Sequence, residues 1–232
     1  MDMLKYTTIL WDNDNTLMDF EYSMQMALKS SFDAFGLEIT EEIIRRYEQI
    51  NNSYWKRLER REITKAELLN GRFFDLFQEI GVSIDVEAFR RFFQIELGSY
   101  YSYLDDSLEI CRQLKGKVKQ YIVTNGVLET QMKKIKAAGF MDLMEDIFVS
   151  EVIGFEKPQK EYFDGCLSKI SEKNLNKILI VGDSLTSDIA GGNAAGIKTC
   201  WYNPSGKKAG DVYKIDYEIR DLHQIFDVIY DV

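Results

Sequence analysis

Histidine is nearly absent from this sequence of 232 residues, because His223 is the only one. Ser-His-Asp triads, Cys-His pairs, phosphohistidine chemistry and histidine-based zinc sites all need histidine at the reacting centre. His223 itself lies in residues 221–230, where the sequence predicts a surface helix. Any catalysis must therefore depend on carboxylates, lysine, hydroxyl groups and a metal ion.

Cysteine is also scarce. Cys111, Cys166 and Cys200 are far apart in the sequence, odd in number and outside any CxxC spacing. This pattern suggests neither a disulfide framework nor a zinc site. We expect three buried free thiols instead.

A leader sequence, a membrane-spanning run and an excess of positive charge are missing too. Residues 1–5 carry charged side chains, and the apolar run that follows them soon ends in aspartates. The formal net charge of -9 disfavours binding of nucleic acid polymers but leaves small anionic substrates open. We therefore expect a cytoplasmic protein that acts on a small metabolite, without a nucleic acid or membrane partner.

The second half of the chain alternates between strands and helices. Strands are predicted at 6–11, 118–123, 147–149, 178–181 and 199–202, with helical segments between them. Such alternation predicts an α/β fold with a doubly wound, mainly parallel sheet that helices cover on both faces. The hydrophobic fraction of 45% is sufficient for a core of this kind.

A helical block interrupts this pattern after the first strand. We expect a core domain of residues 1–17 and 98–232 and an inserted helical domain of residues 18–97, with hinges at the two connections. Glycines, N-caps and a capping box mark its helix ends, at Gly36, Gly81, Thr40, Asp85 and Thr64–Glu67. Most of its apolar side chains at helical spacing are predicted to form a core: Ile43, Ile44, Tyr47, Trp55, Leu58, Phe73, Phe74 and Phe77.

Two carboxylates stand where the first predicted strand ends. Asp12 and Asp14 follow the apolar residues 6–11, and the intervening Asn13 tolerates turn conformations well. Ligands of open parallel sheets bind beyond the carboxyl ends of the strands, so both acids are placed for chemistry. Taken alone, the same string also fits a helix N-cap followed by an ordinary loop carboxylate.

Thr124 and Lys157 occupy comparable positions later in the chain. Thr124 and Asn125 follow the second core strand, where a hydroxyl and successive backbone N–H groups can bind a phosphoryl oxygen. Pro158 restricts the backbone of Lys157 ahead of the next helix, which would help to aim the ammonium group. The structural alternatives are a threonine in a simple turn and an exposed loop lysine.

A second acidic cluster follows the strand at 178–181. Gly182 allows close backbone approach before Asp183, and Asp188 comes five residues later, where it would also fit a helix's first turn. The glycines of this region lack the GxGxxG spacing of a dinucleotide site, and no GxxxxGK[ST] sequence occurs. A phosphate-binding loop of the nucleotide-triphosphate type is therefore excluded.

In order and context, these residues resemble the four signature motifs of the haloacid dehalogenase (HAD) superfamily. The match spans the whole core, and the inserted block is similar to the family's type 1 helical cap. Two departures are mild, because Asn15 replaces a frequent glycine and Gln159 a frequent acid. The resemblance implies a Rossmann-like core, a Mg²⁺ cofactor and an aspartyl-phosphate intermediate in the hydrolysis of a phosphate monoester.

The resemblance also implies a role for each matching residue. Asp12 would be the nucleophile and Asp14 the general acid and base, with Asp12, the Asp14 backbone carbonyl and Asp183 binding Mg²⁺. The substrate phosphate would be bound by Thr124, Asn125 and Lys157. Supporting roles fall to Thr16, Gly182 and Asp188, the last of which would hold the metal shell or Lys157.

Three other functions remain to be compared with phosphate ester hydrolysis. Dehalogenases displace halide and usually lack the second acid, so Asp14 disfavours that activity. A sugar phosphomutase similar to β-phosphoglucomutase keeps all of these residues. A phosphometabolite sensor without turnover is the non-enzymatic alternative, although degenerate sites usually lose the nucleophile or the second acid.

The strand-end motif, the length of the helical block and the residues around Lys157 resemble the bacterial pyrimidine 5'-nucleotidases, which suggests a nucleoside monophosphate as substrate. Tyr54 or Trp55 would then stack on a base, beside anion-attracting Lys56, Arg57, Arg60 and Arg61. A core aromatic next to a solvated, charged helix face explains the same residues, and we favour that explanation.

Overall fold

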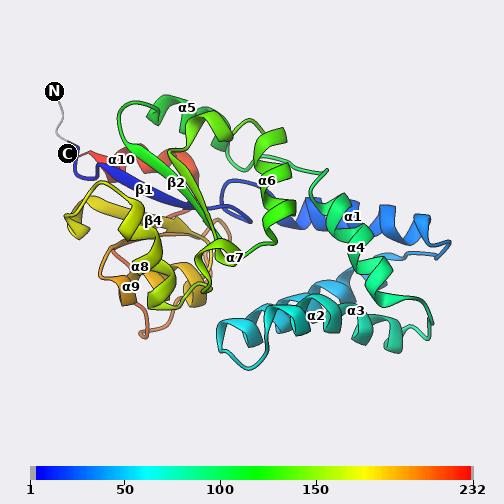
Figure 1. The fold of residues 1–232 in the computed structure, drawn as a ribbon. Helices are drawn as coiled ribbons and strands as arrows, with labels where there is room; N and C mark the ends of the chain where they lie inside the picture. Colours follow the sequence, from blue (N-terminus) through cyan, green and yellow to red (C-terminus); the bar gives the residue numbers. More distant parts are fainter. Residues whose placement is uncertain (1–3, 231–232) are drawn as a thin grey trace. The chain divides into compact units, whose positions relative to one another are not determined.

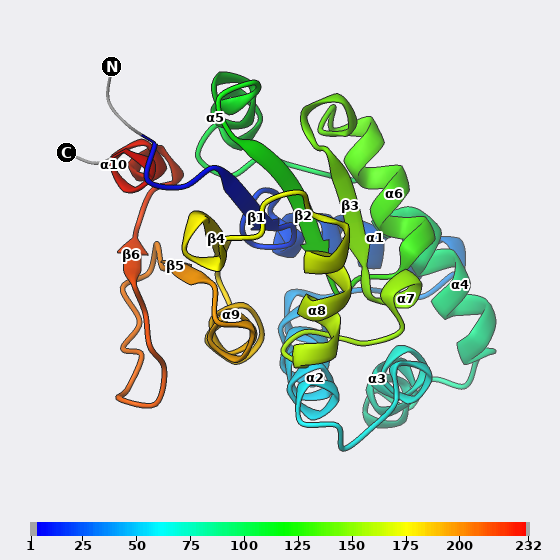
Figure 2. The same cartoon turned by 60° about the vertical axis from the view of Figure 1, so that its left-hand side comes forward.

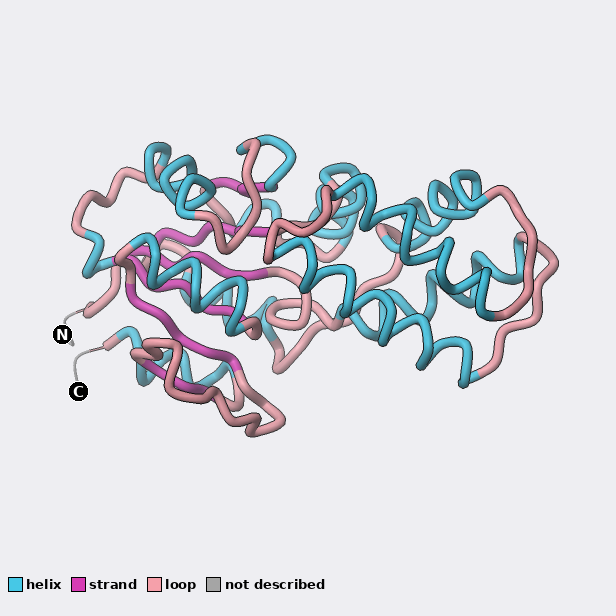
Figure 3. The backbone as a smooth tube through the Cα atoms, turned by 90° about the horizontal axis from the view of Figure 1, so that it is seen from below, coloured by secondary structure: helices cyan, strands magenta, loops and turns pink. Residues whose placement is uncertain are grey.

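The computed structural model describes residues 4–230, in which six strands form one parallel sheet (Figures 1 and 3). The strands are β1 (Thr8–Asp12), β2 (Lys119–Thr124), β3 (Asp146–Val149), β4 (Ile178–Gly182), β5 (Lys198–Tyr202) and β6 (Tyr217–Ile219). Their order in the sheet is β3-β2-β1-β4-β5-β6, and every neighbouring pair is parallel. The predicted doubly wound α/β fold is thereby confirmed.

The first strand lies in the interior of the sheet. From β1 the chain builds outward through β2 and β3 on one side, then returns to build β4, β5 and β6 on the other. The strand order therefore reverses between β1 and β4, and ligands of such sheets bind at this crevice beyond the carboxyl ends. All five residues of β1 are buried, which is typical of a strand covered on both faces.

Helices cover both faces of the sheet (Figure 2). Ile9 and Trp11 of β1 point to the face that packs against α5 (Ser107–Leu114), α6 (Leu128–Ala137) and α10 (Ile225–Ile229). Leu10 points to the opposite face, where α8 (Lys160–Lys169) and α9 (Ala190–Ala195) pack. This alternation follows from the two-residue repeat of a strand. The remaining short helices are α7 (Ser150–Ile153), Met141–Leu143, Leu175–Lys177 and Leu222–Gln224.

The helical segment predicted between the strands at 178–181 and 199–202 begins with an irregular turn. A π-helical turn spans Leu185–Ile189, and α9 follows it. Ser184 starts this turn, because its hydroxyl accepts a hydrogen bond from the Ser187 N–H and its carbonyl accepts one from Ile189. Such turns occur frequently at functional sites.

Residues Glu21–Tyr100 form a second compact unit, and the described residues up to Phe20 and from Tyr101 onward form the first. We call these the helical unit and the sheet unit. The helical unit contains α2 (Glu41–Glu59), α3 (Lys65–Glu79), α4 (Val86–Leu97) and nearly all of α1 (Phe20–Ala34). The predicted N-caps at Thr40 and Asp85 and the capping box of Thr64 and Glu67 are confirmed by their hydrogen bonds.

An aromatic cluster forms the core of the helical unit. The ring of Phe89 lies 5.6 Å from that of Phe32, 5.2 Å from Phe73 and 4.8 Å from Phe77. Phe74 is an exception among the apolar residues of which most were predicted to form this core, because 54% of it is exposed. Phe73 and Phe77 are four residues apart and share one face of α3, whereas Phe74 is turned about 100° away from Phe73. Among the other predicted core residues, Ile43 and Trp55 are only partly buried.

Replacing Phe89 with alanine is expected to lower the free energy of unfolding by about 3–5 kcal/mol, because it leaves a cavity among packed rings. Phe74→Ala removes the same ring from an exposed position and is expected to change stability by less than about 0.5 kcal/mol. Urea unfolding of both variants measures the difference. Equal losses from the two substitutions would contradict this description of the helical unit's core.

The contacts of Tyr54, in the arginine-rich part of α2, support the explanation that this aromatic residue is structural. The guanidinium of Arg57 lies 5.0 Å over the ring of Tyr54, and the Tyr54 hydroxyl donates a 2.8 Å hydrogen bond to Asp75. Tyr54 is therefore already engaged on one ring face and at its hydroxyl. Both contacts lie within the helical unit.

The expectations drawn from rare residues also agree with the structure. Cys111, Cys166 and Cys200 are free and buried, and burial raises the pKa of each thiol. His223 is exposed and pairs with Asp221 at 2.7 Å. Across residues 4–230, every helix is too short or too polar to cross a membrane.

Candidate active site

Three neighbouring strands of the sheet end in candidate site residues. Asp12 is the last residue of β1, Thr124 is the last of β2, and Asp183 directly follows β4. Asp12 is paired with Val123, and Trp11 is paired with Val181, so the three strand ends lie side by side. The parallel sheet thus brings together residues that are more than a hundred positions apart in the sequence.

Lys157 joins these strand ends from the loop between α7 and α8. Its ammonium group donates hydrogen bonds to Asp12 Oδ1 at 2.6 Å, to Asp188 Oδ1 at 2.8 Å and to the Val123 carbonyl at 3.0 Å. An ammonium group has three N–H donors, so all three are used. Only 2% of Lys157 is exposed, which excludes the alternative of an ordinary loop lysine.

The backbone of Lys157 is held by the residue after Thr124. Asn125 accepts the Lys157 N–H at 2.8 Å and donates its side-chain amide to the Lys157 carbonyl at 2.9 Å. The side chain of Asn125 therefore fixes the loop that carries the lysine.

Burial and charge act in opposite directions on Asp12 and Lys157. The pKa of Asp12 is raised to about 7 as the net result of three effects. Burial, the largest, raises it, Lys157 lowers it, and Asp188 raises it. Burial lowers the pKa of Lys157, but the nearby Asp12 and Asp188 more than compensate, so the pKa lies above its ordinary value. Lys157 therefore stays protonated and is the charge that allows a carboxylate to exist at this depth.

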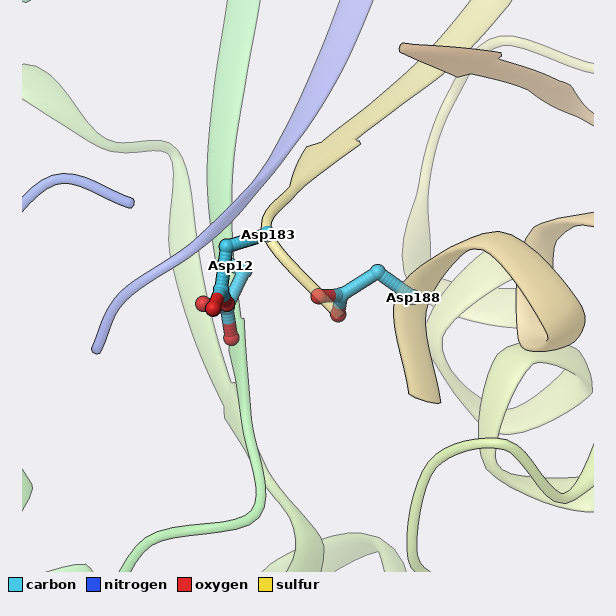
Figure 4. A group of neighbouring side chains, drawn as sticks. All are labelled: Asp12, Asp183 and Asp188. Carbon is cyan, nitrogen blue, oxygen red and sulfur yellow. The ribbon is translucent and has the colours of Figure 1, made fainter. Parts of the chain in front are cut away.

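Three carboxylates form the acidic part of the site. Oxygen atoms of Asp12, Asp183 and Asp188 lie within 4.8 Å of one another, and Figure 4 shows their side chains converging from β1, from the end of β4 and from the helical turn after it. Burial raises the pKa of Asp183 well above its ordinary value, and the neighbouring Asp12 and Asp188 raise it further. A Cβ at Gly182 would lie 2.3 Å from the Asp188 carboxylate, so only glycine permits this approach.

Thr16 connects Asp12, at the end of β1, to Asp183, directly after β4. Its hydroxyl donates to Asp12 Oδ2 at 3.1 Å and accepts the Asp183 N–H at 3.1 Å. Thr124 is 2% exposed, and its hydroxyl accepts the N–H of Gly126 at 3.0 Å. Asn15 adopts a left-handed conformation with φ of 61°, as the turn between Asp14 and Thr16 requires.

The donor set fits a magnesium ion. Three carboxylates and one ammonium leave two negative charges in the cluster when all are ionised, which a divalent cation balances. Carboxylate and carbonyl oxygens are the ligands that Mg²⁺ prefers. Both oxygens of Asp188 accept hydrogen bonds, from Lys157 and from the Ser184 N–H, and both oxygens of Asp12 accept them from Lys157 and Thr16. A carboxylate oxygen has two lone pairs, so each of these residues still has lone pairs to offer the ion beside Asp183.

Two residues near Asp14 were missed by the sequence analysis. Lys134 Nζ lies 2.7 Å from Asp14 Oδ1, and Gln131 Nε2 lies 2.6 Å from Asp14 Oδ2. Both belong to α6, and both are buried. The available signal was their spacing, because Gln131 and Lys134 are three residues apart and share a helix face with the buried apolar Ile135.

Comparison with known proteins identifies relatives along nearly the whole chain. A family model for haloacid dehalogenase-like hydrolases matches residues 6–196. HAD-hydrolase YfnB of Bacillus subtilis is 35% identical over 227 residues, which cover 98% of this chain and 97% of that protein. A magnesium-bound crystal structure of YfnB superimposes with a TM-score of 0.93 and covers 97% of this chain and 98% of that one.

Two further relatives have named substrates. Pyrimidine 5'-nucleotidase PynA of Streptococcus pneumoniae is 30% identical, over 97% of this chain and 95% of that protein. Pyrimidine 5'-nucleotidase YjjG of Escherichia coli is 26% identical, over 96% of this chain and 97% of that protein. The similarity to both therefore includes the helical unit as well as the sheet unit.

Proposed function

Because the chain belongs to the haloacid dehalogenase-like hydrolases, we propose that it hydrolyses phosphate monoesters with Asp12 as the nucleophile. The observation that supports this most is the position of Asp12 at the carboxyl end of β1, in direct contact with the buried ammonium of Lys157 at 2.6 Å. A carboxylate at a strand end, next to a fixed cation, is placed to attack an incoming phosphoryl group.

Electrostatics explains why the cations are needed. A carboxylate about 4 Å from one charge of a phosphate dianion meets a repulsion of about 4 kcal/mol at an effective dielectric constant of about 20. Lys157 offsets part of this repulsion, since it contacts Asp12 and Asp188 together. Mg²⁺ bound by Asp12, Asp183 and the Asp14 backbone carbonyl would supply further positive charge beside the phosphoryl oxygens.

The proposed reaction has two steps. A carboxylate oxygen of Asp12 bonds to phosphorus while the bond from phosphorus to the leaving oxygen breaks, and Asp14 gives that oxygen its proton. Water then bonds to phosphorus as Asp14 takes a proton from it, and the bond to Asp12 breaks, which releases phosphate and regenerates Asp12. Thr124 would bind a phosphoryl oxygen in both steps, and Lys157 would offset the negative charge of the nucleophile and of the phosphoryl group, since each lies beside Asp12 at the carboxyl ends of the strands.

The relatives suggest the substrate class. PynA and YjjG, named as pyrimidine 5'-nucleotidases, align with this chain over almost its full length. We therefore expect nucleoside 5'-monophosphates, and pyrimidine ones first, to be the preferred esters.

Phosphate release from a panel of phosphorylated metabolites tests both parts of this proposal. We expect pyrimidine nucleoside 5'-monophosphates to be hydrolysed with Mg²⁺, and the rate to fall by about 100-fold or more with a chelator, because the charge beside the phosphoryl group is lost. Sugar phosphates serve as the comparison substrates. Isomerisation of a sugar phosphate without phosphate release would indicate a mutase, and phosphate release that is indifferent to chelator would contradict the metal's role.

A further inference from the structure

Helix α6 holds both side-chain oxygens of Asp14. Lys134 contacts Oδ1 at 2.7 Å, and the amide of Gln131 donates to Oδ2 at 2.6 Å. Two donors on separate oxygens fix the rotation of a carboxylate as well as its place, which a single contact does not. Because both donors come from adjacent turns of one helix, they move as one body.

Gln131 is itself held in one orientation. Its side-chain oxygen accepts the Asn13 side-chain amide at 2.5 Å, so its NH₂ group must face Asp14. The backbone of Gly126 makes room for it, because a Cβ there would lie 2.2 Å from Gln131 Nε2. The loop after β2 is thus shaped to admit this amide.

Lys134 has no solvent exposure at all. Burying an ammonium group is costly unless it is paired, and its charged partner is Asp14, at 24% side-chain exposure. The ring of Phe20 lies 5.7 Å from the same ammonium and covers it within the sheet unit. A lysine placed so deeply beside the second acid is unlike the exposed lysines of the same helix.

The two acids of the first strand end therefore have separate cations. Lys157 contacts Asp12, and Lys134 contacts Asp14. The division matters because the two acids have different roles in the proposed reaction. Asp12 bonds to phosphorus, and Asp14 carries a proton to the leaving oxygen. Asp12 must point at phosphorus, whereas Asp14 must point at the leaving oxygen.

We propose that Gln131 and Lys134 are positioning residues that hold the Asp14 carboxylate in the orientation required for proton transfer. The inference rests on the proposed function, since it assigns these residues a role in that reaction. They act through Asp14, so their loss should lower kcat and leave KM nearly unchanged. A misplacement of about 1 Å in a reacting group can cost about 100-fold in rate.

The test uses Gln131→Leu and Lys134→Met, with Lys136→Met as the matched control on the exposed side of α6. Two substrates separate the roles. An alkyl phosphate needs its leaving oxygen protonated, whereas p-nitrophenyl phosphate releases a stable phenolate. We expect the single-turnover rate of leaving-group release, which reports the first step alone, to fall by about 10-fold to 100-fold on the alkyl ester in both variants, with a clearly smaller loss on the aryl ester and KM within about twofold. Lys136→Met should match the wild type on both substrates.

A double-mutant cycle shows whether the effect passes through Asp14. In an Asp14→Asn background, measured on p-nitrophenyl phosphate, Lys134→Met and Gln131→Leu should each add less than about a twofold loss. A merely structural role would lower the single-turnover rate of leaving-group release equally on the two substrates, and equally with Asp and with Asn at position 14. Either of these two equalities would overturn the inference. Urea unfolding of each variant shows how far folding contributes.

Failure of the inference can be told apart from failure of the proposed function. If Asp14→Asn abolishes hydrolysis of the alkyl ester while the α6 variants behave as wild type, only the inference is wrong. If the wild-type protein releases no phosphate, the proposed function is wrong, and crystal structures of the two variants still test the positioning role. We expect the Asp14 side chain to leave its wild-type rotamer in both variants, and an unmoved side chain would overturn the inference.

Discussion

Replacing Asp12 with asparagine is expected to lower kcat for phosphate release by about 10⁴-fold or more, because an amide cannot form the bond to phosphorus that a nucleophilic carboxylate forms. The substitution keeps the shape of the side chain and leaves Lys157 paired with Asp188 at 2.8 Å. Measurement of single-turnover and steady-state phosphate release gives the loss directly. Full activity in Asp12→Asn would refute the proposed mechanism.

Asp12→Asn should lower activity, but it should not lower the thermal stability of the metal-free protein. Burial raises the pKa of Asp12 to about 7, so the ionised carboxylate at higher pH opposes folding when metal is absent. In chelator at about pH 8, we expect Asp12→Asn to melt at the same temperature as the wild type or a few degrees higher. Asp164→Asn, on the exposed face of α8, is the matched control and should leave both activity and the melting temperature unchanged.

Replacing Lys157 with methionine is expected to damage both folding and catalysis. It leaves Asp12 and Asp188 buried without the ammonium that contacts both, and breaking a buried ion pair from one side costs about 3–5 kcal/mol. Loss of one preorganised positive charge should lower kcat by a further factor of about 100 to 1000. Urea unfolding in chelator and phosphate release with Mg²⁺ measure the two effects separately.

Lys160→Met provides the control three residues further along. Lys160 pairs with Asp164 on the exposed surface of α8, so its removal should cost less than about 1 kcal/mol and leave kcat unchanged.

The pH dependence of Lys157→Met adds a second check. Without Lys157, the pKa of Asp12 in the folded state rises further above its unfolded value, so the folded state binds more protons. The stability deficit should therefore shrink between about pH 8 and about pH 5. A deficit that is constant over this interval would mean that the lysine's charge is not what stabilises the fold.

The sheet and its strand ends could be predicted from the sequence because their signals are local. The apolar run before Asp12 identifies β1, and the same pattern before Asp183 identifies β4. Parallel strands then place both acids at one edge, without knowledge of any side-chain contact. Thr124 follows from the same argument for β2.

What could not be predicted depends on contacts between segments. Sequence periodicity placed Phe74 in a group of which most members were expected in the core, but only three-dimensional packing decides which face of α3 is covered. The two contacts of Asp14 with α6 span 117 and 120 positions, so no local pattern reveals them. Asn125 was expected at a phosphate, and its two hydrogen bonds with the backbone of Lys157, 32 positions away, add a supporting role that spacing does not reveal.

The interior position of β1 sets the order in which the chain can fold during synthesis. Thr8 pairs with Lys119, which is made 111 residues later, and with Ile178, which is made 170 residues later. During synthesis, the helical unit with its own aromatic core is therefore complete before either partner strand of the buried β1 exists. For that interval a wholly buried strand has no partner strand, so we expect nascent chains that end before β2 to aggregate more readily than the finished protein.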